Sequence, residues 1–183
     1  MKRIGSLLFV ILIIIVGCGK EPEMNAVTSI EQESARQQNK MPKEMPGTFD
    51  FMVRFGYGTV NKNEINTFQD TVTKDLIMNG TATAQITLTK EEMRSIYGKM
   101  RDINIMGEKE LGAANQTCER VPYGEDIWEV NINGETKTLT WTDRYCAQTS
   151  DMEQLLELRN FVEQIVKTKE EYKKLPESEG GYE

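Results

Sequence analysis

Residues 49–57 read Phe-Asp-Phe-Met-Val-Arg-Phe-Gly-Tyr, and their pattern is the strongest indication of the fold. Large apolar side chains stand at every second position, with Asp50, Met52, Arg54 and Gly56 between them. Because successive side chains of a β-strand point to opposite faces, this period of two predicts a strand with one buried face. Such a strand must bury its apolar face against other elements, which we expect in the flanking sequence.

Four further stretches predict strands. The second strand is expected within residues 64–76, with Phe68, Val72 and Leu76 on its buried side. A third and shorter strand is expected at residues 82–88. The last two, at 125–133 and 136–142, form a predicted hairpin.

The hairpin allows two registers around the turn residues 133–135. A turn centred on Asn133-Gly134 pairs Trp128 with Leu139, whereas one centred on Gly134-Glu135 pairs Trp128 with Trp141. Both registers put the same five apolar side chains on one face of the hairpin: Trp128, Val130, Ile132, Leu139 and Trp141.

Two segments predict amphipathic helices, each opened by a capping box. The first begins at Thr89-Lys90-Glu91-Glu92, and the second begins at Ser150-Asp151-Met152-Glu153 and ends near Lys169. Their apolar stripes are Met93, Ile96, Tyr97, Met100 and Ile103 in the first, and Leu155, Leu158, Val162, Ile165 and Val166 in the second. The order β-β-β-α-β-β-α predicts an α+β fold, a mainly antiparallel sheet of about five strands with two helices on one face.

The start of the chain predicts export. Lys2 and Arg3 precede the apolar run 7–16, which is half the roughly 20 residues that a membrane-spanning helix needs. Ile15-Val16-Gly17-Cys18 then resembles the lipobox of bacterial lipoproteins, a likeness confined to the first 18 or so residues. The resemblance implies cleavage before Cys18 and anchoring through acyl chains on that cysteine. The alternative is an ordinary secretory signal or an uncleaved anchor with a chance cysteine.

We expect four parts along the chain. Residues 1–17 are the signal peptide, and 18–47 are the lipidated cysteine and a flexible tether, too poor in apolar residues to fold. Residues 48–169 form a single α+β domain, and 170–183 a frayed acidic tail. The exported part resembles uncharacterised lipoproteins of Gram-positive bacteria, which implies the outer face of the cell membrane and assigns no site residues.

Charge and composition exclude several functions. After cleavage, 20 basic residues face 29 acidic ones, and this negative balance argues against binding nucleic acid. The chain contains no histidine, which removes His-based nucleophile pairs and His metal ligands. We therefore expect no metal and no other cofactor. Cys118 and Cys146 are predicted to form a disulfide in an oxidising setting, with two free buried thiols as the alternative.

No catalytic residue can be selected from the sequence. Five carboxylates flank the predicted strands, and a pair of them could act on a polysaccharide, although acidic residues this frequent are usually solvated: Asp70, Asp75, Glu125, Asp126 and Asp143.

Four aromatic residues are the candidates for stacking on a sugar or a partner: Tyr123, Tyr145, Trp128 and Trp141. Core packing is the competing interpretation for the two tryptophans. The sequence therefore predicts a non-catalytic binding or accessory domain held at the membrane by its lipid, with an envelope protein or wall polymer as partner. The alternative is a carboxylate-dependent hydrolase of an envelope polymer.

Overall fold

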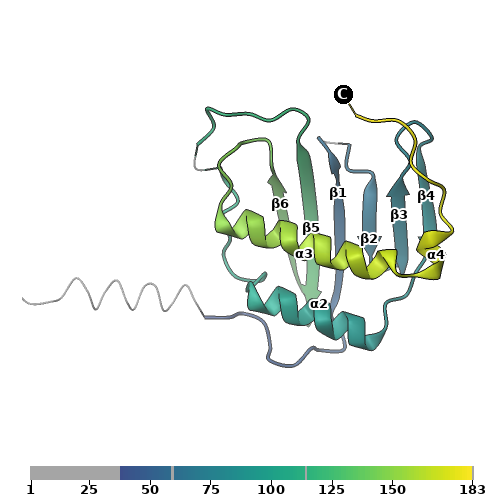
Figure 1. Cartoon of the computed structure of the whole chain (residues 1–183). Coiled ribbons are helices and arrows are strands. Elements are labelled where there is room, and N and C mark those ends of the chain that lie inside the picture. Colours follow the sequence, from purple (N-terminus) through teal and green to yellow (C-terminus); the bar gives the residue numbers. More distant parts are fainter. Residues whose placement is uncertain (1–37, 59, 114, 183) are drawn as a thin grey trace, which may run out of the picture. The chain divides into compact units, whose positions relative to one another are not determined.

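The structure, a computed structural model, describes residues 38–58, 60–113 and 115–182. Within these ranges an antiparallel sheet of six strands carries two long helices on one face, which confirms the α+β class (Figure 1). The strands are β1 (Asp50–Tyr57), β2 (Asn63–Asn66), β3 (Thr71–Asp75), β4 (Thr81–Gln85), β5 (Gly124–Ile132) and β6 (Glu135–Thr142). The helices are α2 (Lys90–Asp102), α3 (Ser150–Lys167) and the short α4 (Glu170–Lys173). The predicted signal peptide and Cys18 lie outside the described residues.

Strand β1 lies in the middle of the sheet, whose order is β4-β3-β2-β1-β5-β6. It pairs with β2 on one edge and with β5 along its whole length on the other. Phe51, Val53 and Phe55 point into the core beneath the helices and are almost fully buried. The alternation in residues 49–57 therefore predicted both the strand and its buried face correctly.

The β5–β6 hairpin adopts one of the two predicted registers. Trp128 lies opposite Leu139, so the turn is centred on Asn133-Gly134. Both turn residues have positive φ, 54° and 84°, as a two-residue hairpin turn requires. The five apolar side chains assigned to one face of the hairpin are all buried in the core.

The predicted second strand is two strands, β2 and β3, so the sheet has six strands and not about five. Residues 67–70 form a turn between them, with Asp70 in the left-handed region at φ 53°. Thr67 fixes this turn, since its hydroxyl accepts from the Phe51 amide at 2.8 Å and lies 3.0 Å from the Asp50 carboxylate. Phe68 is consequently at the turn and 44% exposed, and the prediction that it is buried was wrong.

Both predicted helices form, and the first has the predicted cap. The Thr89 hydroxyl accepts from the Glu92 amide, and the Glu92 carboxylate accepts from the Thr89 amide at 2.8 Å. The cap of α3 is Thr149, one residue before the predicted Ser150, because the Thr149 hydroxyl accepts from the Met152 amide. Met152, the third residue of the helix, is almost fully buried in the core.

The folded part extends beyond both predicted domain boundaries. Met41, expected in the tether, is buried in the core, and the Tyr97 hydroxyl donates to the Pro42 carbonyl at 2.7 Å. The segment after Lys169, expected to fray, forms α4 and then passes the end of β3, where Glu179 and Ile77 form an isolated parallel β-bridge. No helix in the described part of the chain is long and apolar enough to cross a membrane.

Candidate functional site

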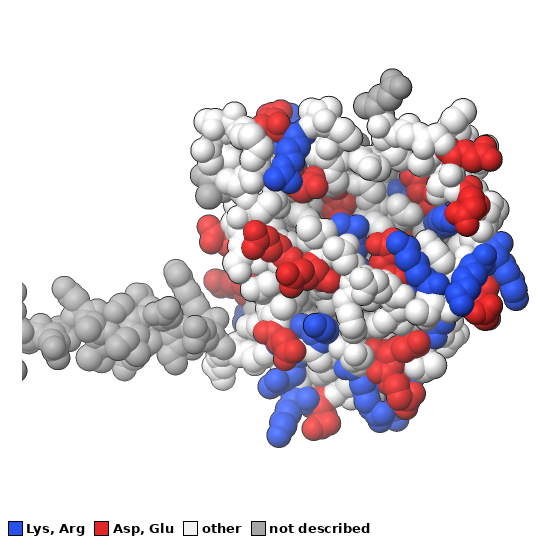
Figure 2. All heavy atoms as spheres, viewed as in Figure 1, with Lys and Arg blue, Asp and Glu red and all other residues white. Residues whose placement is uncertain are grey.

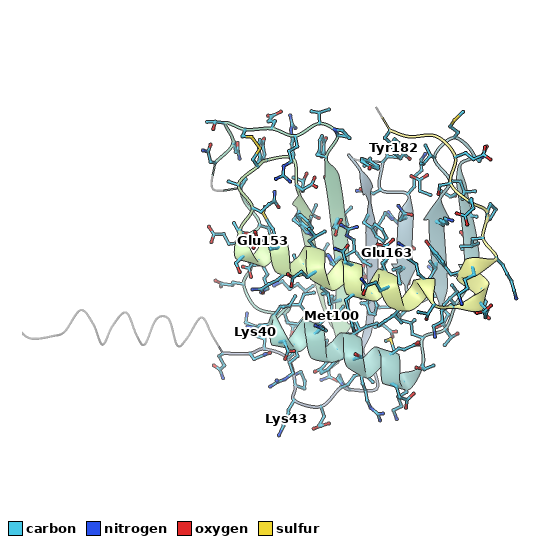
Figure 3. The ribbon with its side chains drawn as sticks, viewed as in Figure 1. Lys40, Lys43, Met100, Glu153, Glu163 and Tyr182 are labelled. Carbon is cyan, nitrogen blue, oxygen red and sulfur yellow. A yellow bond between two sulfur atoms is a disulfide. The ribbon has the colours of Figure 1, made fainter. Side chains whose placement is uncertain are left out.

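A groove of about 970 Å³ lies where one end of the sheet meets α3 and the C-terminal segment. Its walls come from the ends of β1, β3 and β5, from α3, and from residues 172–182. Acidic and basic side chains both border the hollow above α3 (Figure 2). Glu163 and Tyr182 lie on opposite sides of it (Figure 3).

Asp126 lies in the groove on the helix-covered face of β5. Because successive side chains of β5 point to opposite faces, Asp126 lies on the same face as Trp128, and it is only 3% exposed. Its Oδ2 lies 2.9 Å from the Nε atom of Arg159 on α3. The Arg159 guanidinium in turn lies over the Phe55 ring, 5.0 Å from its centroid. The buried Asp126 carboxylate therefore pairs with the Arg159 cation, which in turn packs on the Phe55 ring.

Burial raises the pKa of Asp126 to about 7, and the nearby charges of Asp143 and Glu163 add to the rise. The Arg159 cation opposes the rise without cancelling it. Asp143, which follows β6, accepts a hydrogen bond from the Gly124 amide. The groove therefore holds a carboxyl group that changes charge near neutral pH.

The C-terminal segment forms the opposite wall through Tyr182. Its hydroxyl donates to the buried Asp75 carboxylate, which raises the pKa of Tyr182, and accepts from Lys62 Nζ at 3.2 Å. The Tyr182 ring packs against Tyr57, with 4.8 Å between centroids. The Ser178 hydroxyl donates to the Asp75 carbonyl at 2.7 Å. These contacts fix the end of the chain along β3.

The structure separates the four aromatic candidates. Trp128 and Trp141 are 0% and 4% exposed, so they pack in the core and present no face to a ligand. Tyr123 and Tyr145 flank the guanidinium of Arg144, whose Cζ lies 5.5 and 5.7 Å from their ring centroids. This cluster does not line the groove.

The predicted disulfide is present beside that cluster. Cys118 and Cys146 are bonded, with 5.5 Å between their Cα atoms, and the Cys146 amide donates to the Cys118 carbonyl at 3.1 Å. The bond ties the loop before β5 to the segment after β6.

Three of the five candidate carboxylates line the groove, namely Asp75, Asp126 and Asp143. Glu125 instead accepts from the Asn61 side chain at 2.8 Å, and Asp70 is in the turn between β2 and β3.

Sequence reasoning missed the helix side of the groove. Arg159, Glu163 and Lys167 recur at every fourth position of α3 and all line the groove. That spacing was the available signal, but it is equally typical of a solvated helix face. Within the described ranges, no group of three or more Cys, Asp or Glu side chains is arranged to hold a metal ion. The sequence matches no protein-family model and no curated protein.

Proposed function

We propose that this protein is a lipoprotein on the outer face of a bacterial cell membrane that binds an envelope component without transforming it. Anchoring through Cys18 rests on the lipobox resemblance of residues 15–18. The observation that carries the binding function is the groove, whose size of about 970 Å³ is at the upper end for small-ligand sites. Its lining combines aromatic rings with both signs of charge, which suits a polar polymer or a peptide segment.

The position of the groove supports this proposal. The described chain begins beside α2, where Asn39 donates to the Arg101 carbonyl at 2.6 Å and the Lys40 amide donates to Asn104 at 2.9 Å. The groove lies on the other side of α3, at the opposite end of β1 (Figure 1). Residues 39 and 40, where the described chain enters the domain, therefore lie away from the groove.

Site-specific photo-crosslinking in living cells tests the proposal. A photoreactive amino acid replaces Lys173, which lines the groove, in the full-length chain. The matched control carries it at Arg94, an exposed position on α2. We expect a dominant cross-linked product, protein or wall polymer, from position 173 and not from position 94. The same products from both positions, or none from 173, would overturn the proposal.

A hydrolase of an envelope polymer is the second candidate, favoured by one observation. Asp126, with its pKa raised to about 7, lies near Asp143 in a concave site, as the proton donor of a carboxylate pair would. The Arg159 contact argues against this role, because a general acid must give its proton to substrate and not stay paired with a cation.

Incubation of the purified chain with isolated cell wall, followed by chromatography of soluble fragments, separates the two functions. Fragments that disappear with Asp126→Asn and with Asp143→Asn would establish the hydrolase. Binding to wall material without fragments would support the binding domain.

A further inference from the structure

We propose that the inner end of the groove binds a primary ammonium group on an extended stem, held between Asp126 and Asp143. The inference rests on the proposed binding function and names the chemistry of the ligand. Such a group occurs on a lysine-type peptide side chain or on a free polyamine, and both present the same ammonium to the site.

The charges at this end of the groove do not balance. Asp126 pairs with Arg159 at 2.9 Å, and Glu163 pairs with Lys167 at 2.7 Å. Asp143 forms no ion pair among the described residues and accepts the Gly124 amide. When Asp126 is ionised, one negative charge is therefore in excess at this end of the groove, and a bound cation would neutralise it.

Asp126 has few hydrogen-bond donors around it. Among the described residues its buried Oδ2 faces one donor, the Nε atom of Arg159 at 2.9 Å, and this contact has the distance of an ion pair but falls short of ideal hydrogen-bond geometry. Buried carboxylates normally accept several hydrogen bonds. An ammonium group supplies three donors, enough to serve both Asp126 and Asp143.

The surroundings suit an ammonium on a stem better than a metal ion. No three acidic or cysteine side chains of the described residues are arranged around one point as metal ligands. Aromatic rings of the groove already pack against amines, since Lys74 lies 5.8 Å from the Tyr172 ring and Lys62 lies 5.6 Å from the Tyr182 ring. A methylene stem can lie along the same walls while its amine reaches the carboxylates.

The site should exchange a proton for the cation. In the empty groove burial holds the pKa of Asp126 at about 7, with Arg159 and Glu163 facing it from α3 and Asp143 from the segment after β6. An ammonium beside it favours the charged carboxylate and lowers that pKa. Binding at pH 7 therefore releases a fraction of a proton, which a neutral ligand would not cause.

Isothermal titration calorimetry of the full-length chain in detergent tests the inference. The probes are the peptide acetyl-Gly-Lys-Gly-amide and 1,5-diaminopentane, each titrated at pH 7 in two buffers of different ionisation enthalpy. We expect at least one amine to bind, with a heat that depends on the buffer. Acetylation of the lysine side chain should weaken peptide binding by roughly tenfold or more, since a charge-assisted hydrogen bond is lost.

Asp143→Asn should weaken amine binding by a similar factor, roughly tenfold. Asparagine keeps an oxygen that can accept from the Gly124 amide, so the fold is retained. The matched control is Asp102→Asn, an exposed residue at the end of α2, which should leave binding unchanged.

Equal binding of the free and the acetylated peptide, or no binding of either amine at millimolar concentration, would overturn the inference. Binding of the peptide alone assigns the ligand to a peptide side chain, and binding of the diamine alone assigns it to a free polyamine. Groove cross-links in cells without amine binding would leave the proposed function standing and remove only the ammonium ligand. Amine binding without groove cross-links would remove only the envelope partner.

Discussion

Asp126 of β5 and Arg159 of α3 meet across the inner end of the groove, with 2.9 Å between Oδ2 and Nε and side chains that are 5% and 20% exposed. A strand and a helix that are distant in sequence thus join through a largely buried ion pair. Such a pair adds little net stability, because removing two charges from water offsets their attraction, but losing one partner is costly.

Arg159→Met should destabilise the protein by roughly 3 kcal/mol at pH 8, since it leaves Asp126 buried without a cation. The loss should shrink at pH 5, where Asp126 can take up a proton. Urea denaturation at both pH values measures the two losses. Arg94→Met is the control, because its pair with Glu91 is exposed and should contribute less than about 0.5 kcal/mol. Equal losses for both variants would contradict the structural role of the pair.

Asp126 should make the folded protein less stable as the pH rises. The pKa of Asp126 is 3.8 in the unfolded chain and about 7 in the folded protein, so the folded protein binds the Asp126 proton more tightly. The stabilisation that comes from this proton is lost as the pH rises from about 4 to 7. The full effect is on the order of 4 kcal/mol. The Asp126→Asn variant should lack this decline, and denaturation from pH 4 to 8 measures it.

Glu92 and Asp151 act in the opposite direction. Burial tends to raise the pKa of each, but Lys169 beside Glu92 and Lys109 beside Asp151 outweigh it and hold both pKa values low. Their stabilisation is present above the unfolded pKa and is lost as the pH falls through the lower folded value. A stability that rises steadily from pH 4 to 8 in the native protein would show that Asp126 is not the dominant group.

Tyr182→Phe should release the C-terminal segment from the groove. The change removes the hydroxyl that donates to Asp75 and accepts from Lys62. We expect amide hydrogen exchange at residues 175–181 to accelerate by roughly tenfold, while the core strands change little, because one hydrogen bond to a charged group is lost locally. Tyr57→Phe keeps the ring that packs on Tyr182 and is the control. Unchanged exchange in the tail of the Tyr182 variant would mean that other contacts hold it.

Replacing Cys118 and Cys146 together with serine should lower the free energy of unfolding by roughly 3 kcal/mol, since the bond closes a loop between residues 28 apart in sequence. Thermal and urea denaturation of the variant and the native chain measure the difference. In the native chain, thiol labelling under denaturing conditions should detect these two cysteines only after reduction. Labelling of both without reductant would show that the bond is absent in the cell.

Cys18→Ser should abolish membrane retention of the processed protein, because it removes the lipid attachment point that the lipobox predicts. Cell fractionation with mass spectrometry of the N-terminal peptide measures both retention and the acyl mass. The neighbouring change Gly19→Ser keeps the lipobox and should leave retention intact. Equal retention of both variants would refute lipid anchoring.

Much of the fold was predictable because it depends on close neighbours. The alternation of residues 49–57 and the cap at Thr89 are local patterns, and each forms as predicted. The hairpin also forms where predicted, with one of the two registers that its turn residues allowed. The errors arose where distant residues decide. Thr67 forms a hydrogen bond with β1 that fixes the turn at Phe68. Asn39 bonds to α2 and Ser178 bonds to β3, and these contacts hold the two ends of the domain.

The candidate site was predictable only in its parts. Asp75, Asp126 and Asp143 were recognised as carboxylates that flank strands, but nothing in the sequence distinguished Asp126 from the exposed ones. The same groove is also lined by Arg159, Glu163 and Tyr182. These residues follow Asp126 by 33 to 56 positions in the sequence, so no local pattern connects them with it.

Residue spacing and type alone were enough to predict β1, the β5–β6 hairpin, the two long helices with their apolar stripes, and the cysteine pair. The core positions of Trp128 and Trp141 and the raised pKa of Asp126 became apparent only from the packed fold, because both depend on burial. Loss of water around a side chain, and the charges that replace it, depend on which elements pack together, and β5 and α3 meet only in the folded sheet.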